Sequence, residues 1–172
     1  MNFIGKALAG ITAMASVMVP VEASTFEDHI RLAQTIEERG VDFLLNPVAC
    51  GSKNALGWYH AYSRTLVVCQ ENATPGGPEV AWTEEDLDTL RHEAHHLVQD
   101  CMDDNLNGSL ESVYQSPSKL VTSVLTKDQI LTILDWYSDA TDNRKLMELE
   151  AFSVAILNNP VDQISDIHRY CF

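Results

Sequence analysis

The segment His92-Glu93-Ala94-His95-His96 places the tightest constraint on how this chain can fold. His92 and His96 are four residues apart, so in an α-helix both imidazoles lie on one face and can share one metal ion. Glu93 follows the first histidine, where it can accept a proton from a metal-bound water. One side of such a helix can be buried by Leu87, Leu90, Ala94, Leu97 and Val98. The competing interpretation is a solvated helix that carries three histidines by chance.

A catalytic metal site needs a third protein ligand beside one open coordination position. The spacing variant with a third histidine six residues after the second is excluded, because Met102 occupies that position. The downstream side chains that could supply the ligand are Asp103, Asp104, Glu111, Glu148, Glu150 and His168.

Residues 148–155 form an apolar stretch with helical spacing that contains two carboxylates. Buried carboxylates are costly unless they are paired, protonated or bound to metal. Periodicity puts Glu148 on one face with Ala151, Phe152 and Ala155. It puts Glu150 on another face with Leu146, Met147, Val154 and Leu157. The two alanines favour Glu148 as the ligand, because small side chains let this helix approach the histidine helix closely, and Glu150 stays open as the alternative.

Together, the two motifs resemble those of the gluzincins, zinc peptidases whose third ligand is a glutamate on a second helix. The segment Glu148-Leu149-Glu150-Ala151 is similar to the Glu-x-Glu-Ala-Asp motif of the CAAX prenyl protease and heat-shock membrane protease family. In that family the first glutamate is the ligand, which corresponds to Glu148, whereas Phe152 replaces the aspartate. Those relatives are integral membrane proteins, and the resemblance covers two short motifs only.

The resemblance implies a zinc metalloendopeptidase with one Zn²⁺ ion held by His92, His96 and Glu148, and with Glu93 as general base. The partner would be a peptide or protein substrate that adds to an edge strand near residues 57–62. The alternative is an exported, non-catalytic zinc-binding or interaction module. The oxyanion could be stabilised by one of several side chains: His168, Tyr59, Tyr62, Tyr114, Tyr137 or Tyr170.

Residues 1–23 have the layout of a cleaved secretory signal peptide, with Lys6, an apolar run over 7–19 and small residues before a cleavage point after Ala23. The apolar run is shorter than the roughly 20 residues of a spanning helix, so we expect no stable membrane insertion after cleavage. Residues 24–172 would then form a single domain that is secreted or periplasmic. The net charge of −14 argues against nucleic-acid partners.

Export agrees with the even number of cysteines, which are Cys50, Cys69, Cys101 and Cys171. In an oxidising compartment the default is two disulfides, with three possible connectivities. Cys50 and Cys69 flank an expected hairpin, so we favour the pairs Cys50–Cys69 and Cys101–Cys171. A four-cysteine zinc site is disfavoured, because the chain has no pair with CxxC spacing.

The pattern of apolar residues and caps predicts an α+β fold. Helices are expected over 25–40, 83–100, 126–139 and 142–157. Strands are expected over 41–45, 57–62 and 65–70. Residues 105–118 are expected to form a polar loop, and the segment after 157 stays unassigned. The expected architecture is zincin-like, with a small antiparallel sheet packed against the helix that contains His92 and against further helices.

Overall fold

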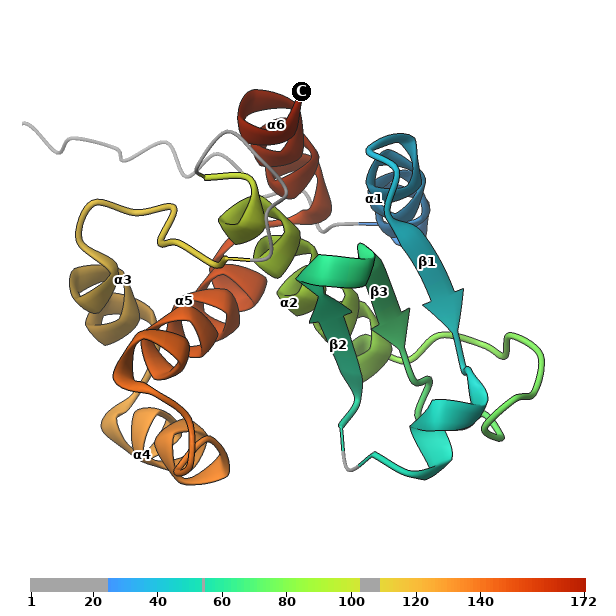
Figure 1. The fold of residues 1–172 in the computed structure, drawn as a ribbon, viewed down its shortest axis with the longest axis horizontal. Helices are drawn as coiled ribbons and strands as arrows, with labels where there is room; N and C mark the ends of the chain where they lie inside the picture. The colour runs from blue at the N-terminus through green and yellow to red at the C-terminus, as the bar shows by residue number, and fades with distance from the viewer. Residues whose placement is uncertain (1–24, 54, 103–108) are drawn as a thin grey trace, which may run out of the picture.

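The computed structural model describes residues 25–53, 55–102 and 109–172 (Figure 1). Within these ranges the chain forms six α-helices and a three-stranded sheet, so the α+β class is confirmed. The expected signal peptide and the candidate ligands Asp103 and Asp104 lie outside the described residues.

Capping residues define where the helices begin. α1 (Phe26–Glu38) begins after a capping box formed by Thr25 and Asp28, and α2 (Glu84–Asp100) after a capping box formed by Thr83 and Asp86. In each box the two side chains satisfy backbone N–H groups that have no partner within the helix. These local signals explain why both helices start where the sequence predicted.

The sheet consists of β1 (Asp42–Leu45), β2 (Gly57–His60) and β3 (Thr65–Val68) in the order β1-β3-β2. β2 and β3 form the expected antiparallel hairpin, but β1 pairs with β3 in parallel. The expectation of an antiparallel sheet is therefore wrong, and the sheet is mixed. The reason is the connection over residues 46–56, which passes the end of β3. β2 therefore runs opposite to β1, and β3 lies between them and pairs with both.

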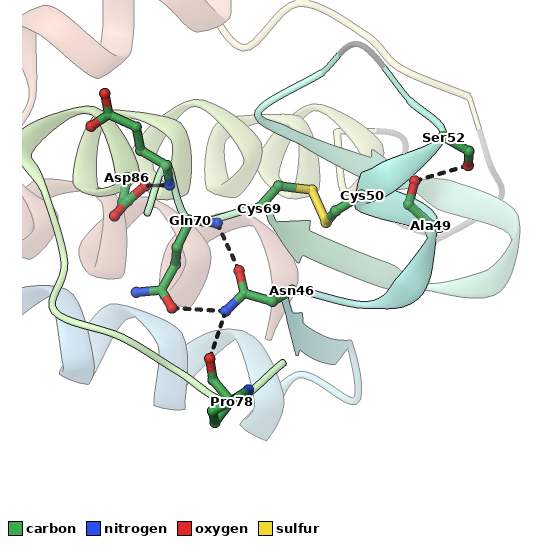
Figure 2. The surroundings of a disulfide bond; sticks show 9 residues. Asn46, Ala49, Cys50, Ser52, Cys69, Gln70, Pro78 and Asp86 are labelled. Atoms are coloured by element: carbon green, nitrogen blue, oxygen red, sulfur yellow. Dashed lines mark hydrogen bonds between the residues drawn. A yellow bond between two sulfur atoms is a disulfide. The ribbon is translucent and has the colours of Figure 1, made fainter. Parts of the chain in front are cut away.

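A disulfide and a polar network hold this crossing segment in place (Figure 2). Cys50 is bonded to Cys69, directly after β3. Asn46 adopts a left-handed φ of 51°, which asparagine tolerates better than most residues. Its side-chain oxygen accepts a hydrogen bond from the Gln70 N–H at 2.8 Å, and its amide donates to the Gln70 side chain at 2.9 Å. The segment that follows β1 is thus fixed at two points to the residues that follow β3.

Two helices were not predicted, and each begins with a proline. α3 (Pro117–Val124) starts within the expected loop, ahead of α4 (Lys127–Trp136). α5 (Asp142–Leu157) has the expected bounds, and α6 (Pro160–Cys171) follows it almost at once. Proline suits the first helical position, where no N–H partner is needed. Pro160 therefore marks the start of the next helix as well as the end of α5.

α2 is the central element, between the sheet and α5 (Figure 1), and it also packs against α1 and α6. From His92 to Asp100 every side chain of α2 is buried, although the sequence predicted burial of one side only. The main core surrounds this helix and includes Leu32, Ile36, Leu66, Leu90, Leu97 and Ile167. A smaller core between α3, α4 and α5 contains Val121, Leu125, Ile133 and Leu149.

The second disulfide joins Cys101, which directly follows α2, to Cys171 at the end of α6. Both cysteine pairs are those that the sequence favoured. Two disulfides fit an extracellular or periplasmic location. Across the described ranges, every helix is too short or too polar to traverse a lipid bilayer.

Candidate metal centre

Three side chains that the sequence singled out meet in the interior. The Nε2 atoms of His92 and His96 lie 3.1 Å apart. Glu148 Oε2 lies 3.2 Å from the first and 3.3 Å from the second. All three side chains are buried, and they form a group that could hold a metal ion.

The spacing of these three atoms can be compared with that of a zinc site. Ligand atoms at about 2.0–2.1 Å from a tetrahedral zinc ion lie about 3.3–3.4 Å from one another. The observed separations of 3.1–3.3 Å agree closely with this value. Two imidazole nitrogens and one carboxylate oxygen are also a donor set typical of catalytic zinc. The residues therefore fit a divalent metal ion.

Glu148 reaches the histidines because α5 lies close to α2. Ala151 is completely buried and Ala155 nearly so, and Arg91 Nε donates to the Ala155 carbonyl at 2.9 Å. Small residues on this face permit the approach, as the sequence suggested. Glu150 projects from another face of α5 and is not part of the group.

Electrostatics keep Glu148 ionised in spite of its burial. Burial alone would raise the pKa of this carboxyl, but hydrogen bonds from His92 and His96 outweigh it and hold the pKa well below its usual range. The second oxygen, Oε1, lies 2.5 Å from Nη2 of Arg144, one turn earlier on α5. Burial would lower the pKa of His96, but the bond to Glu148 raises it.

Glu93 lies beside the group, beneath the sheet. Its side chain is buried, and it packs against Gly57 of β2. A Cβ atom placed on Gly57 would lie 3.2 Å from Glu93 Cγ and 2.6 Å from the Thr89 methyl group. β2 is an edge strand of the described sheet, and this glycine lets it pass close to Glu93.

Among the candidates for oxyanion stabilisation, the structure places Tyr137 near the His92–His96–Glu148 group. Burial raises the pKa of its phenol, and the nearby charges of Glu148 and Glu93 raise it further. Tyr59 serves a different purpose, since its hydroxyl donates to the buried Asp100 at 2.8 Å. Tyr62 is highly exposed, and the sequence alone could not separate these tyrosines.

Phe152 packs against His92. The centroid of its ring lies 4.3 Å from that of His92, and Trp136 follows at 6.1 Å from Phe152. Nδ1 of His92 is buried without a hydrogen-bond partner among the described residues. Phe152 occupies the position of the aspartate in the resembled motif. This side of His92 is therefore packed against an apolar ring.

His96 is supported in a different way, by Gln99, which the sequence reasoning missed. Nδ1 of His96 lies 2.7 Å from the side-chain oxygen of Gln99. The Gln99 amide nitrogen lies 3.1 Å from the Met147 carbonyl and 3.1 Å from Glu150 Oε1. The sequence signal for this role is a polar side chain three residues after a candidate histidine ligand on the same expected helix.

Glu150 is the centre of a second buried network. Its Oε1 atom accepts from His95 Nε2 at 2.9 Å and from the Val113 N–H at 3.0 Å, and Ser112 donates to Oε2. Burial lowers the pKa of His95, and its Nε2–H donates to the Glu150 carboxylate. Burial opposes ionisation of Glu150, but the bonds from His95 and Ser112 outweigh it and lower its pKa. His95 therefore belongs to this network.

The remaining candidates lie elsewhere. Glu111 is exposed, and His168 is exposed on α6 with its ring against Phe172. A surface cavity of about 630 Å³ is bordered by Phe26, Trp82 and Leu87 among others, and none of its lining residues belongs to the His92–His96–Glu148 group.

The distances between His92, His96 and Glu148 and the chemistry of their donor atoms thus identify a candidate metal centre. Its position between α2 and α5 depends on the close approach of these two helices. Comparison of the chain with protein-family models, with curated proteins and with solved structures gave no match.

Proposed function

We propose that this protein is an exported zinc-dependent endopeptidase that hydrolyses peptide bonds in peptide or protein substrates. His92, His96 and Glu148 are the metal ligands, and Glu93 is the general base. One observation supports this most strongly: the three ligands meet next to Glu93 of α2, and Glu93 lies against Gly57 of β2, an edge strand of the described sheet. Metal, base and a surface for an extended peptide are then adjacent.

Each residue of the site has a defined part in the proposed reaction. A bound zinc ion would lower the pKa of a coordinated water and polarise the substrate carbonyl. Glu93 accepts the proton of the attacking water and later donates it to the leaving amine. Tyr137 is the hydroxyl donor for the carbonyl oxygen as that oxygen becomes negative. Arg144 balances the charge of Glu148 from the side away from the histidines.

The substrate would bind as an additional strand along β2. Peptides commonly bind to an exposed sheet edge through main-chain hydrogen bonds. β2 pairs with β3 on one side only, so within the described sheet its other edge is available. Because Gly57 has no side chain, this strand runs close to Glu93, and a peptide added there would pass near the metal ligands.

The second candidate is an exported, non-catalytic zinc-binding or interaction module. It is favoured by the burial of the ligands, since His96 and Glu148 are each only 1% exposed. The described cavity of about 630 Å³ also lies elsewhere on the surface. A fully enclosed metal is typical of structural sites, whereas a catalytic site keeps one position open.

Exchange of Glu93 for glutamine distinguishes the two functions. Wild type, Glu93→Gln and the control Glu85→Gln, an exposed glutamate on the same helix, should each be assayed for zinc content and for cleavage of a peptide library. The peptidase predicts about one zinc per chain in all three and cleavage lost only in Glu93→Gln. Bound zinc without cleavage by any of the three supports the module. Failure of the wild type to bind added zinc contradicts both.

A further inference from the structure

We propose that Gln99 and Glu150 are positioning residues that orient His96 for metal binding. This inference rests on the metal site of the proposed function, but it does not require the protein to be a peptidase. It concerns only how the chain holds one imidazole, and it predicts a difference between His96 and His92 that the sequence motif does not contain.

The orientation of the Gln99 amide follows from its partners. Its nitrogen lies 3.1 Å from the Met147 carbonyl oxygen and 3.1 Å from Glu150 Oε1. A backbone carbonyl can only accept a hydrogen bond, so the NH₂ group must point toward Met147. The amide oxygen is thereby directed at Nδ1 of His96, 2.7 Å away.

The same logic sets the tautomer of His96. An amide oxygen can only accept, so Nδ1 must carry the proton that it binds. The lone pair used for metal coordination is then on Nε2, the atom that faces His92 and Glu148. Ligating histidines in metal sites are generally held in this way by a partner of the other ring nitrogen.

The Glu150 carboxylate, which accepts from Gln99, is itself held in place by other residues. Three further groups donate to its carboxylate, from His95 on α2 and from Ser112 and Val113 in the segment before α3. Glu150 is completely buried, so water does not compete for these bonds. This carboxylate therefore connects the segment at 112–113 to the orientation of a metal ligand.

The two histidines are consequently supported unequally. His92 has the ring of Phe152 at 4.3 Å, and its Nδ1 lacks a hydrogen-bond partner among the described residues. His96 has a complete set of polar partners extending to Glu150. Disruption of Gln99 should therefore affect metal binding through His96 alone.

Gln99→Leu tests the proposal, with Gln163→Leu as a matched control. Gln163 is equally buried, and its amide donates to the Arg91 carbonyl of α2 at 2.8 Å, without contact with the ligands. Loss of a residue that orients a ligand typically lowers metal affinity by about 10–100-fold. We expect this loss of zinc affinity in Gln99→Leu, measured by chelator competition, and little change in Gln163→Leu.

Glu150→Gln provides a second variant that preserves volume. If Glu150 acts through Gln99, Glu150→Gln should lower zinc affinity in the wild-type background. The same substitution should have no further effect in Gln99→Leu, so the effects of the two substitutions should be non-additive. In zinc-loaded wild type, nitrogen–proton NMR should show a slowly exchanging Nδ1–H on His96 and an Nε2–H on His95. Only the His96 signal should be lost in Gln99→Leu.

Two results would overturn the proposal. Equal zinc affinity in Gln99→Leu and Gln163→Leu would remove Gln99 from any positioning role. Additive effects of Gln99→Leu and Glu150→Gln would show that the two residues act independently. Either result would leave zinc binding by wild type intact, whereas a wild-type chain that fails to bind zinc would contradict both the metal centre and this inference.

Discussion

Removal of the disulfide between Cys101 and Cys171 should destabilise the protein more than removal of the other bridge. In the chain-entropy account a crosslink stabilises by restricting the unfolded chain, and its effect grows with the length of the closed loop. The sequence separation is 70 residues for Cys101–Cys171 and 19 for Cys50–Cys69. These lengths correspond to about 4 and about 3 kcal/mol at 25 °C, a difference of about 1 kcal/mol.

Packing acts in the same direction. Cys101 and Cys171 are each 3% exposed, whereas Cys50 and Cys69 are only partly buried, so alanine removes more buried surface at the first pair. The assay is urea unfolding of the two double variants, Cys101→Ala/Cys171→Ala and Cys50→Ala/Cys69→Ala, with metal removed by chelation. A larger loss of unfolding free energy in the second variant would refute the reasoning from loop length and burial.

Three further predictions concern the strand edge, the metal centre and the response to acid. Gly57→Ala should lower the free energy of unfolding by about 1–3 kcal/mol in urea titrations, because its Cβ would lie 2.6 Å from a backbone carbonyl oxygen; a loss below about 0.5 kcal/mol would contradict the close approach. Zinc at about 100 times its dissociation constant should add about 2.7 kcal/mol to the stability of wild type, measured as a rise in melting temperature, and far less to Glu148→Gln; equal shifts would exclude Glu148 as a ligand. Acidification below pH 6.5 should destabilise the chain, because burial, with the charge of Arg91, lowers the pKa of His29 in the folded state, and the unfolded state therefore takes up this proton first. His29→Gln should reduce this pH dependence of the unfolding free energy in urea titrations at pH 7.5 and 5.5, and an unchanged pH dependence would contradict the role of His29.

Much of the secondary structure was predictable because its signals are local. The capping boxes at Thr25 and Thr83 define helix starts through hydrogen bonds between residues three apart. α5 was predicted to the residue. α6 was missed although Asn159, Pro160 and Asp162 supply the same kind of cap, because a proline is compatible both with the end of one helix and with the start of the next.

The sheet shows where local reasoning fails. Each strand was located from its apolar run, but strand direction depends on how residues 46–56 travel between β1 and β2. That path is held by contacts between distant residues, including Asn46 with Gln70 and Cys50 with Cys69. No periodicity within a strand encodes such contacts, so the parallel pairing of β1 and β3 could not be derived.

The sequence by itself determined that His92 and His96 share a helix face with Glu93 beside them, since helix geometry follows from spacing alone. Only the tertiary structure decided between Glu148 and Glu150, because that choice depends on the angle at which α5 meets α2. It also decided that Gln99 would support His96, because the His92–Asp100 part of α2 is buried on all sides, and a buried polar side chain such as Gln99 is costly without a hydrogen-bond partner.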